Sequence, residues 1–325
     1  MIDKLGRQIE YLRISVTQNC NLKCIYCSPS ESSCTQKCPV PLRPEEFEKI
    51  VRSMTKVGIR KVRITGGEPL TRPDVCEIIE RISKIQGIED ISMTTNGINL
   101  DRMAEKLKAA GLKRLNISLD SLKKDRFEYI TRGGRLEDTL KGIEKAMALG
   151  LNPVKINTVL IKGINDDEID DFIQLAKDKP VEVRFIELMP IGRFGEQNSD
   201  KIVRNSEIIN ARPELVFCED CLEGQPARYY RIEGYKGKIG FISPISHRFC
   251  SSCNRIRLTC DGKIRPCLGS NGEVDVTEVL RKEPDKLDAF IEKIIYEKPE
   301  GHNFGSNFSS TRSMNMNMSM NMIGG

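Results

Sequence analysis

The sequence contains no tryptophan and only two histidines, His247 and His302, among its 325 residues. Acid–base catalysis centred on histidine is therefore not expected. No run approaches the roughly 20 apolar residues that a membrane helix needs. The N-terminal residues lack the apolar stretch and small-residue cleavage site of a secretory signal. These absences predict a cytoplasmic protein that does not bind membranes.

Positive and negative charges nearly balance, so the net charge is only +5. Hydrophobic residues make up 39% and charged residues 30%, which is typical of a folded globular protein rather than a disordered one. The mild positive charge is compatible with a small anionic substrate. It is too weak and too dispersed to indicate a nucleic-acid surface.

Cysteine, in contrast, is abundant, with twelve residues. A reducing compartment keeps thiols free, so these cysteines need a use other than disulfides. Several of them stand close together in the sequence, which favours ligation of a metal or a metal cluster.

Short β-rich runs alternate with amphipathic stretches from residue 9 to about residue 189. The expected strands are Ile9–Val16, Lys61–Thr65, Ile91–Thr95, Arg114–Leu119, Val154–Ile161 and Val181–Leu188. The expected helices are Pro44–Val57, Pro73–Ile85, Leu100–Ala110, Leu136–Leu149 and Asp166–Lys177. Such alternation predicts parallel strands with right-handed crossovers. Because six units fall short of a closed eight-stranded barrel, the sequence predicts an α/β fold with an incomplete (β/α)6 TIM-like barrel.

The pattern changes after Met189, and we expect a C-terminal α+β extension. Its elements are a helix near Ser206–Ala211, a β-hairpin over Tyr229–Ile245 and a final helix near Pro284–Tyr296. From Lys298 onward the polar, repetitive composition predicts a disordered tail. We place the barrel domain at residues 1–215 and the extension at residues 216–325.

Cys20, Cys24 and Cys27 directly follow the first expected strand. Catalytic groups of parallel barrels gather at this carboxyl end of the strands. Three thiolates can hold a small cubic iron–sulfur cluster and leave one iron open for a ligand. A zinc site is the alternative, with Cys34 or Cys38 as the fourth ligand.

This Cys-x3-Cys-x2-Cys spacing, with Tyr26 before the last cysteine, resembles the signature of the radical S-adenosylmethionine superfamily. The segment Thr65-Gly66-Gly67-Glu68-Pro69 resembles the family's glycine-rich cofactor loop, and Asn116–Asp120 resembles a segment that contacts the cofactor. The resemblance implies a 4Fe–4S cluster that passes an electron to S-adenosylmethionine, producing a radical that abstracts hydrogen from a substrate. It also implies cofactor contacts from Tyr26, Gly67 and Ser118.

Cys250, Cys253 and Cys267 form a second set of three thiols, accompanied by Arg255, Arg257 and Arg265. A structural zinc site remains the alternative, completed by Cys260 or by Cys218 with Cys221. Closely spaced guanidinium groups suit a cavity for a phosphate-rich or carbonyl-rich substrate better than a structural site.

With this second set, and with the terminal Gly324-Gly325, nearly the whole chain resembles the GTP 3′,8-cyclase family of molybdenum cofactor biosynthesis. The resemblance implies a second 4Fe–4S cluster that binds the guanine ring, a catalytic role for Gly324 and Gly325, and a cofactor contact from Met189. It implies GTP as substrate, a flavodoxin- or ferredoxin-type reductant, and a downstream cyclic pyranopterin monophosphate synthase; it is compatible with a homodimer. The expected GTP-binding residues are Arg13, Arg63, Thr94, Lys155, Arg184, Arg255, Arg257 and Arg265.

Cations on four expected barrel strands indicate an anionic ligand independently of the family resemblance. Arg13, Arg63, Lys155 and Arg184 would be costly inside a barrel unless an anion filled it. The sequence has no Gly-x4-Gly-Lys-Ser/Thr loop, so side chains would have to grip a triphosphate. The rival hypotheses are a two-cluster radical enzyme that modifies a peptide and a zinc-binding regulatory protein. Six cysteines have no role in the family's pattern, which leaves them as inert thiols or as ligands of a further metal: Cys34, Cys38, Cys76, Cys218, Cys221 and Cys260.

Overall fold

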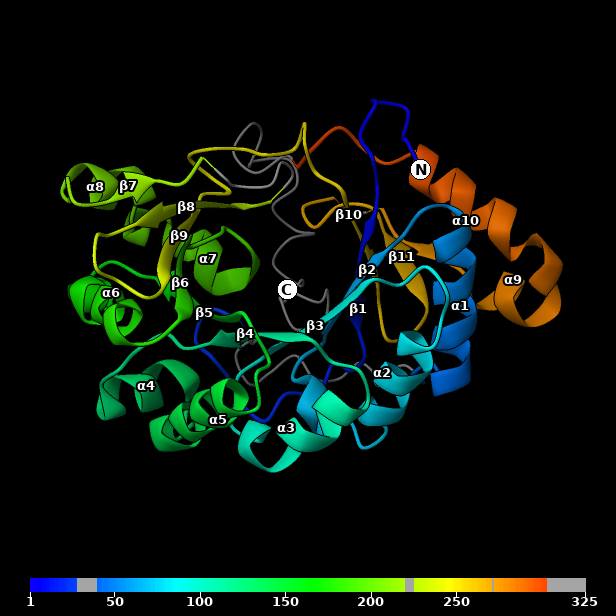
Figure 1. Ribbon diagram of the computed structural model, residues 1–325. Helices are drawn as coiled ribbons and strands as arrows, with labels where there is room; N and C mark the ends of the chain where they lie inside the picture. The colour runs from blue at the N-terminus through cyan, green and yellow to red at the C-terminus, as the bar shows by residue number, and fades with distance from the viewer. Residues whose placement is uncertain (28–39, 220–224, 271, 303–325) are drawn as a thin grey trace.

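Within the residues that the structure describes, twelve strands form one sheet, in the order β12-β11-β10-β1-β2-β3-β4-β5-β6-β9-β8-β7. The structure is a computed structural model, and it describes residues 1–27, 40–219, 225–270 and 272–302. The strands are β1 Tyr11–Ser15, β2 Lys61–Thr65, β3 Asp90–Thr95, β4 Arg114–Ser118, β5 Val154–Leu160, β6 Val181–Glu187, β7 Val216–Phe217, β8 Ala227–Arg231, β9 Lys238–Ile242, β10 Arg255–Leu258, β11 Lys263–Arg265 and β12 Val274–Asp275. Figure 1 shows that they follow an open arc, with β7–β9 towards one end and β10 and β11 towards the other.

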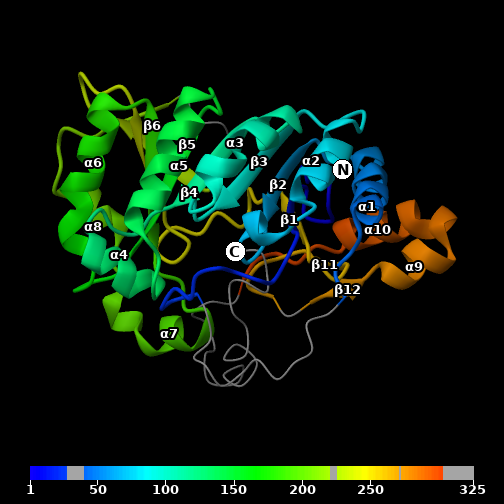
Figure 2. The same cartoon turned by 90° about the horizontal axis from the view of Figure 1, so that it is seen from below.

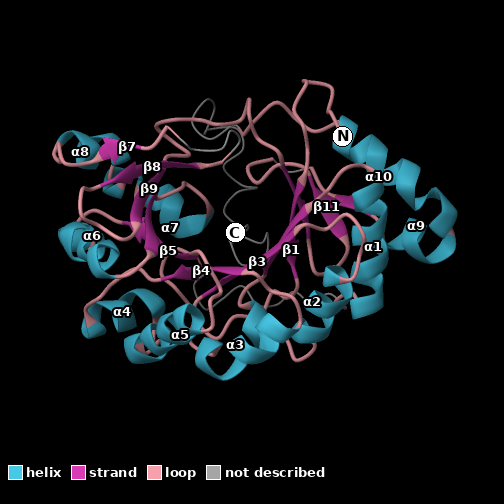
Figure 3. Ribbon diagram, viewed as in Figure 1, coloured by secondary structure: helices cyan, strands magenta, loops and turns pink. Residues whose placement is uncertain are grey.

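Most of the helices lie on the outside of this arc, whereas α7 (Gly192–Gln197) lies within it (Figure 3). They are α1 Pro44–Lys56, α2 Val75–Ser83, α3 Leu100–Ala109, α4 Lys124–Thr131, α5 Leu136–Ala148, α6 Ile169–Asp178, α7 Gly192–Gln197, α8 Asn205–Asn210, α9 Thr277–Lys282 and α10 Leu287–Tyr296. Figure 2, turned by 90°, shows α6 and α8 at one end of the arc and α9 and α10 at the other. No helix in the described part of the chain is long and apolar enough to cross a membrane.

The predicted barrel strands are confirmed as β1–β6, each within two residues of its expected ends. Neighbours among them are parallel, with Tyr11 opposite Lys61 and Leu115 opposite Val154. The five predicted helices of this region are confirmed as α1, α2, α3, α5 and α6. Helix α1 shows why these segments form helices. It begins at Pro44, and the backbone N–H of Arg43 donates to the side chain of Glu46 at 2.9 Å. Its apolar face is buried on the sheet.

Alternation along each strand divides the core from the interior of the barrel. In β2, Val62 and Ile64 are fully buried in the apolar core, whereas Arg63 and Thr65 line an internal cavity. In β5, Val154 packs in the core and Lys155 lines the cavity. Because successive side chains of a strand point to opposite faces, one sequence pattern specifies both the core and the polar lining.

The C-terminal region completes the same sheet from both sides. The predicted hairpin is confirmed as β8 and β9, and β9 lies parallel to β6. Strand β10, which the sequence analysis missed, lies parallel to β1, with Tyr11 opposite Arg255. Eight neighbouring strands are therefore parallel, although only six belong to the predicted β/α units. The proposed division at residue 215 falls between α8 and β7, and the strands after it extend the barrel sheet.

The last described residues differ in part from expectation. The final helix is confirmed as α10, preceded by a short 3-10 turn at Pro284–Lys286. The expectation that the disordered tail begins at Lys298 is wrong for residues 298–302. Lys298 is only 1% exposed, because the chain after α10 folds back onto the second cysteine set. Helices α4, α7 and α9 were not predicted.

Candidate active site

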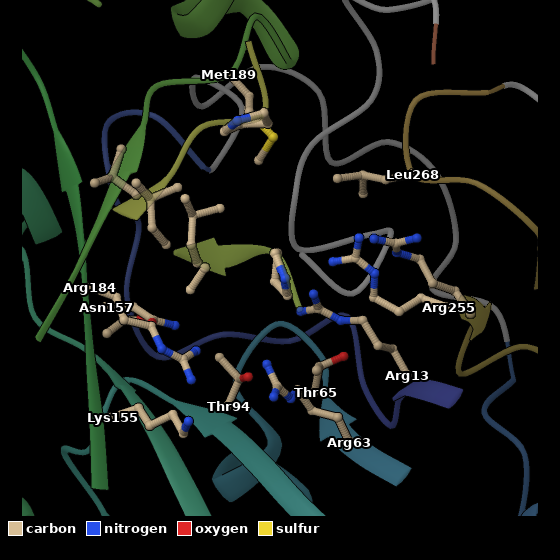
Figure 4. Close-up of a pocket in the computed structure, with 18 of the residues that line it drawn as sticks. Arg13, Arg63, Thr65, Thr94, Lys155, Asn157, Arg184, Met189, Arg255 and Leu268 are labelled. Carbon is tan, nitrogen blue, oxygen red and sulfur yellow. The ribbon is translucent and has the colours of Figure 1, made fainter. Parts of the chain in front are cut away.

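A cavity of about 620 Å³ occupies the inside of the arc. It brings together predicted site residues from the first strand to the C-terminal region. Those that line it are Cys20, Cys24, Cys27, Tyr26, Gly67, Ser118, Met189, Arg13, Arg63, Thr94, Lys155, Arg184, Arg255, Arg257, Cys250, Cys253 and Cys267. In Figure 4, the labelled cations point into one space, Lys155 and Arg184 from one side and Arg13 and Arg255 from the other.

The first cysteine set lies in the loop after β1, at one end of this cavity. Backbone N–H groups of Lys23 and Ile25 donate to Thr131 and Ile130, which tie the loop to the end of α4. Burial raises the pKa of the Cys24 thiol well above its usual value. A buried thiolate needs nearby positive charge, which the irons of a cluster supply, so this donor set fits the cluster that the sequence predicts.

Tyr26 is held by a carboxylate that the sequence analysis did not single out. Its hydroxyl donates to Asp120 Oδ2 at 2.6 Å, and the N–H of Val159 donates to the other oxygen at 2.8 Å. Burial raises the pKa of Asp120 to about 6. Asp120 therefore orients the aromatic ring beside the cysteine loop. It closes the Asn116–Asp120 segment, so its place in that motif was the available signal.

The two glycines of the Gly-Gly-Glu-Pro segment bring two backbones together. The N–H of Gly67 donates to Thr17 O at 2.6 Å, and that of Glu68 donates to Asn19 O at 2.7 Å. A Cβ at Gly67 would lie 2.3 Å from Asn19 O. The close approach required here is thus to the cysteine loop itself, in addition to any approach to a ligand.

Glu68, in the same segment, is held by the end of β3. Its carboxylate accepts hydrogen bonds from Thr95 Oγ1 and from the N–H of Asn96, both at 2.7 Å. Burial raises the pKa of Glu68 to about 7. The side chain therefore connects the glycine-rich segment to the end of β3, and it also lines the cavity.

The middle of the cavity is strongly basic. Burial, together with neighbouring guanidinium groups, lowers the pKa of Arg13 well below its usual value. Burial lowers the pKa of Arg63 and that of Arg257 to about 10. Buried cations that depress one another's charged forms provide a site for a multiply charged anion.

A second group of charges comes from three different strands. Lys155 and Glu182 form an ion pair, and Arg184 lies 3.7 Å from the same carboxylate. Lys155 Nζ and Arg184 Nε donate to the Tyr229 hydroxyl at 3.1 and 2.8 Å. Burial, followed by the charge of Arg184, lowers the pKa of Lys155 to about 7. Glu182 and Tyr229 thus position both cations.

The sequence analysis missed both of these positioning residues. Glu182 stands two residues before Arg184 on the same strand face, a spacing that could have revealed it. Tyr229 lies on β8, and nothing local in the sequence links it to β5 or β6.

The second cysteine set lies at the opposite end of the barrel from the first. Cys253 precedes β10, whose first residue Arg255 is opposite Tyr11 at the start of β1. Cys20, in contrast, follows the end of β1. The five residues of β1 rise about 3.3 Å each, which separates the two ends by roughly 16 Å.

The chemistry of this set favours thiolate ligands. Burial alone would raise the pKa of Cys253, but Arg255 and Lys298 lower it to about 6. Cys253 is then a thiolate at neutral pH, which is the form that binds metals. Cys218 and Cys260, considered as zinc ligands, are buried and are not among the residues that line the cavity. Cys34, Cys38 and Cys221 lie outside the described residues. Within the part of the chain that the structure describes, no group of three Cys, His, Asp or Glu side chains is placed to hold a single metal ion.

One predicted site residue in the described part of the chain, Arg265, does not line the cavity, and two others lie outside that part. Gly324 and Gly325 lie outside the described residues. Arg265 is not among the lining residues; its Nη1 donates to Glu273 Oε1 at 2.7 Å and its Nη2 to Ser270 O at 2.9 Å.

A substitution at Arg265 tests its predicted contact with substrate. We expect Arg265→Met to change the Kd for GTP by less than about twofold and to lower the free energy of unfolding by about 1–3 kcal/mol, because it breaks a buried charged hydrogen bond. Equilibrium binding and denaturant unfolding measure the two effects. A large loss of GTP affinity without a loss of stability would instead support the predicted contact between Arg265 and GTP.

Comparison with known proteins now defines the class. The model of the Radical SAM superfamily matches residues 14–176, and that named Molybdenum Cofactor Synthesis C matches residues 181–304. A solved structure of SuiB from Streptococcus suis, bound to S-adenosylmethionine, covers 90% of this chain and 64% of its own, with a TM-score of 0.56 and 16% identity. A second SuiB structure, bound to its precursor peptide SuiA, has a TM-score of 0.60 and 15% identity, with 90% and 66% coverage. At these identities the likeness shows the shared fold alone.

Curated relatives are much more similar in sequence. A protein of Alkaliphilus oremlandii named GTP 3′,8-cyclase is 51% identical over 303 residues, 93% of this chain and 94% of that protein. One from Clostridium botulinum with the same name is 50% identical over 306 residues, with the same coverage. The chain belongs to the GTP 3′,8-cyclase family of the Radical SAM superfamily.

Proposed function

We propose that this protein is a GTP 3′,8-cyclase, a lyase that converts GTP into (8S)-3′,8-cyclo-7,8-dihydroguanosine 5′-triphosphate, the first step of molybdopterin biosynthesis. The observation that carries the proposal is the buried basic cavity between two cysteine sets. The similarity to relatives of that name over 93% of the chain supports it.

The first cysteine set would hold a 4Fe–4S cluster, with S-adenosylmethionine contacted by Tyr26, Gly67, Ser118 and Met189. When bound, the two groups would supply one-electron, radical chemistry to the substrate. The protein's part is to orient the cofactor against the substrate and to exclude water. Asp120, through Tyr26, and Glu68, through the end of β3, keep this wall of the cavity in place.

The substrate would lie across the basic part of the cavity. Arg13, Arg63, Lys155 and Arg184 suit the triphosphate, because charge-assisted hydrogen bonds to phosphate are strong in a buried site. Thr94 lines the same space. Cys250, Cys253 and Cys267 would hold a second 4Fe–4S cluster near the guanine ring, with Arg255 and Arg257 beside it. A flavodoxin- or ferredoxin-type protein would supply the electron, and a cyclic pyranopterin monophosphate synthase would consume the product.

Anaerobic turnover with a reductant, S-adenosylmethionine and GTP tests the function directly. We expect 5′-deoxyadenosine to form in step with the loss of GTP. Formation of 5′-deoxyadenosine at the same rate without GTP would reject this substrate and favour the peptide-modifying alternative. Metal analysis of the anaerobically purified protein is the companion measurement, since zinc without iron would reject radical chemistry altogether.

The role of the terminal glycines is tested by truncation. We expect deletion of Gly324-Gly325 to abolish product formation while the iron content stays that of the full chain, because the resemblance assigns these residues to the reaction and not to ligation. Full activity of the truncated protein would show that the terminus is dispensable.

A further inference from the structure

The five described residues after Glu297 pack directly on the second cysteine set. Lys298 Nζ lies 3.7 Å from Cys253 Sγ and donates to Pro266 O at 2.9 Å. A Cβ on Gly301 would lie 3.1 Å from Cys250 Sγ, so the backbone there runs against that cysteine. The chain after α10 thus forms one wall of the thiol site.

The N-terminal turn holds this wall in place. Arg7 Nη1 donates to Glu300 O at 2.8 Å and to Cys250 O at 3.2 Å. Its Nη2 donates to Pro299 O at 2.8 Å and to Lys298 O at 3.2 Å. Asp3 pairs with the Arg7 guanidinium at 2.7 Å and balances its charge. One buried guanidinium therefore connects the wall to the loop that carries Cys250.

The ammonium group of Lys298 faces the sulfur of Cys253. An ammonium group buried to this degree is costly unless an anion lies next to it. Within the described residues, no carboxylate forms an ion pair with Lys298, whereas its Nζ lies 3.7 Å from the Cys253 sulfur. The partner of this lysine is the cysteine set itself.

We propose that Lys298 is a positioning residue for the second cysteine set: it donates a hydrogen bond to the Cys253 sulfur and makes the cluster held there easier to reduce. This inference rests on the proposed function, in which that set holds a 4Fe–4S cluster. Reduction adds one negative charge, and both a hydrogen bond to a ligand sulfur and a nearby cation stabilise the more negative state. Arg7 keeps the lysine within reach of the sulfur.

The test uses the full chain with Cys20, Cys24 and Cys27 replaced by Ala, so that only the second cluster is observed. Lys298→Met removes the charge with little change in length, Lys298→Arg keeps the charge, and Lys286→Met changes a lysine whose side chain is 75% exposed. Iron content and the midpoint potential, followed by electron paramagnetic resonance during a reductive titration, are measured for each. We expect Lys298→Met to shift the midpoint to a more negative potential, and Lys298→Arg and Lys286→Met to stay near the parent protein.

Each outcome has a defined meaning. If Lys298→Met loses iron while Lys298→Arg retains it, the charge is required for ligation and the proposal stands. An unchanged midpoint in an iron-loaded Lys298→Met protein, or equal loss of iron in both variants, would overturn the role of Lys298. A parent protein that binds no iron after the first set is removed would instead overturn the second cluster, and with it that part of the proposed function.

Discussion

Gly67→Ala is expected to reduce cyclase activity by on the order of 100-fold, since a displacement of about 1 Å at a reacting site has an effect of this size. The new Cβ would lie 2.3 Å from Asn19 O and 2.5 Å from Gln18 O. Both are backbone atoms of the loop that carries Cys20, so a side-chain rotation cannot relieve the clash. The loop must move, and the hydrogen bond from Gly67 to Thr17 at 2.6 Å must lengthen.

Two measurements separate this effect from general unfolding. Iron content is expected to fall because the first cysteine set is displaced, whereas the second set lies at the other end of the barrel and keeps its iron. Gly272→Ala is the matched control, since a Cβ there meets nothing within 4 Å. Gly67→Ala protein with full activity and full iron content would show that the loop can absorb the side chain.

Lys155→Met is expected to weaken GTP binding by roughly 10- to 100-fold, because it removes a charge-assisted hydrogen bond from a buried site. Burial and Arg184 lower the pKa of Lys155 to about 7. Below pH 7 the free protein carries the ammonium that an anionic triphosphate prefers. As the pH rises above 7 the lysine loses its proton, so binding must be accompanied by proton uptake and affinity falls.

Calorimetric titration with GTP between pH 6 and pH 9 tests both parts. The parent protein is expected to lose affinity as the pH rises and to take up protons on binding, detected as a dependence of the heat on the buffer. Lys155→Met is expected to bind weakly with a flatter pH dependence, while Lys282→Met, at a side chain 73% exposed, behaves as the parent. A pH profile shared by Lys155→Met and the parent would assign the titration to another group.

Local patterns in the sequence were sufficient for the β/α half of the fold. The order of β1–β6 and the helices between them followed from the alternation of short β-rich runs with amphipathic stretches. Most of the candidate site followed as well, because Arg63 and Lys155 interrupt apolar strands at the positions that face inwards. A cation in such a position is costly without an anionic ligand, so the strand pattern alone indicates a binding site for an anion.

Contacts between distant segments were not predictable in the same way. Tyr229 approaches Lys155 only because β9 adds beside β6 and β8 beside β9. Arg265 carries the same charge as its neighbours on β10 but pairs with Glu273 instead of facing the cavity. Lys298 follows a helix and begins a polar, repetitive segment, and the composition of that segment predicted a disordered tail.

The cysteine-rich sequence, poor in histidine and lacking tryptophan, by itself determined the class of chemistry and the barrel that supports it. The spacing between cysteines and the alternation along strands are local properties, because they depend only on residues that are close in the sequence. The tertiary structure alone decided that the C-terminal strands join both edges of the sheet and place the second cysteine set across the barrel from the first. It also decided that Arg7 and Lys298, near opposite ends of the described chain, meet at that set. Such pairings depend on which surfaces remain unsatisfied after the barrel has formed, and no local pattern contains that information.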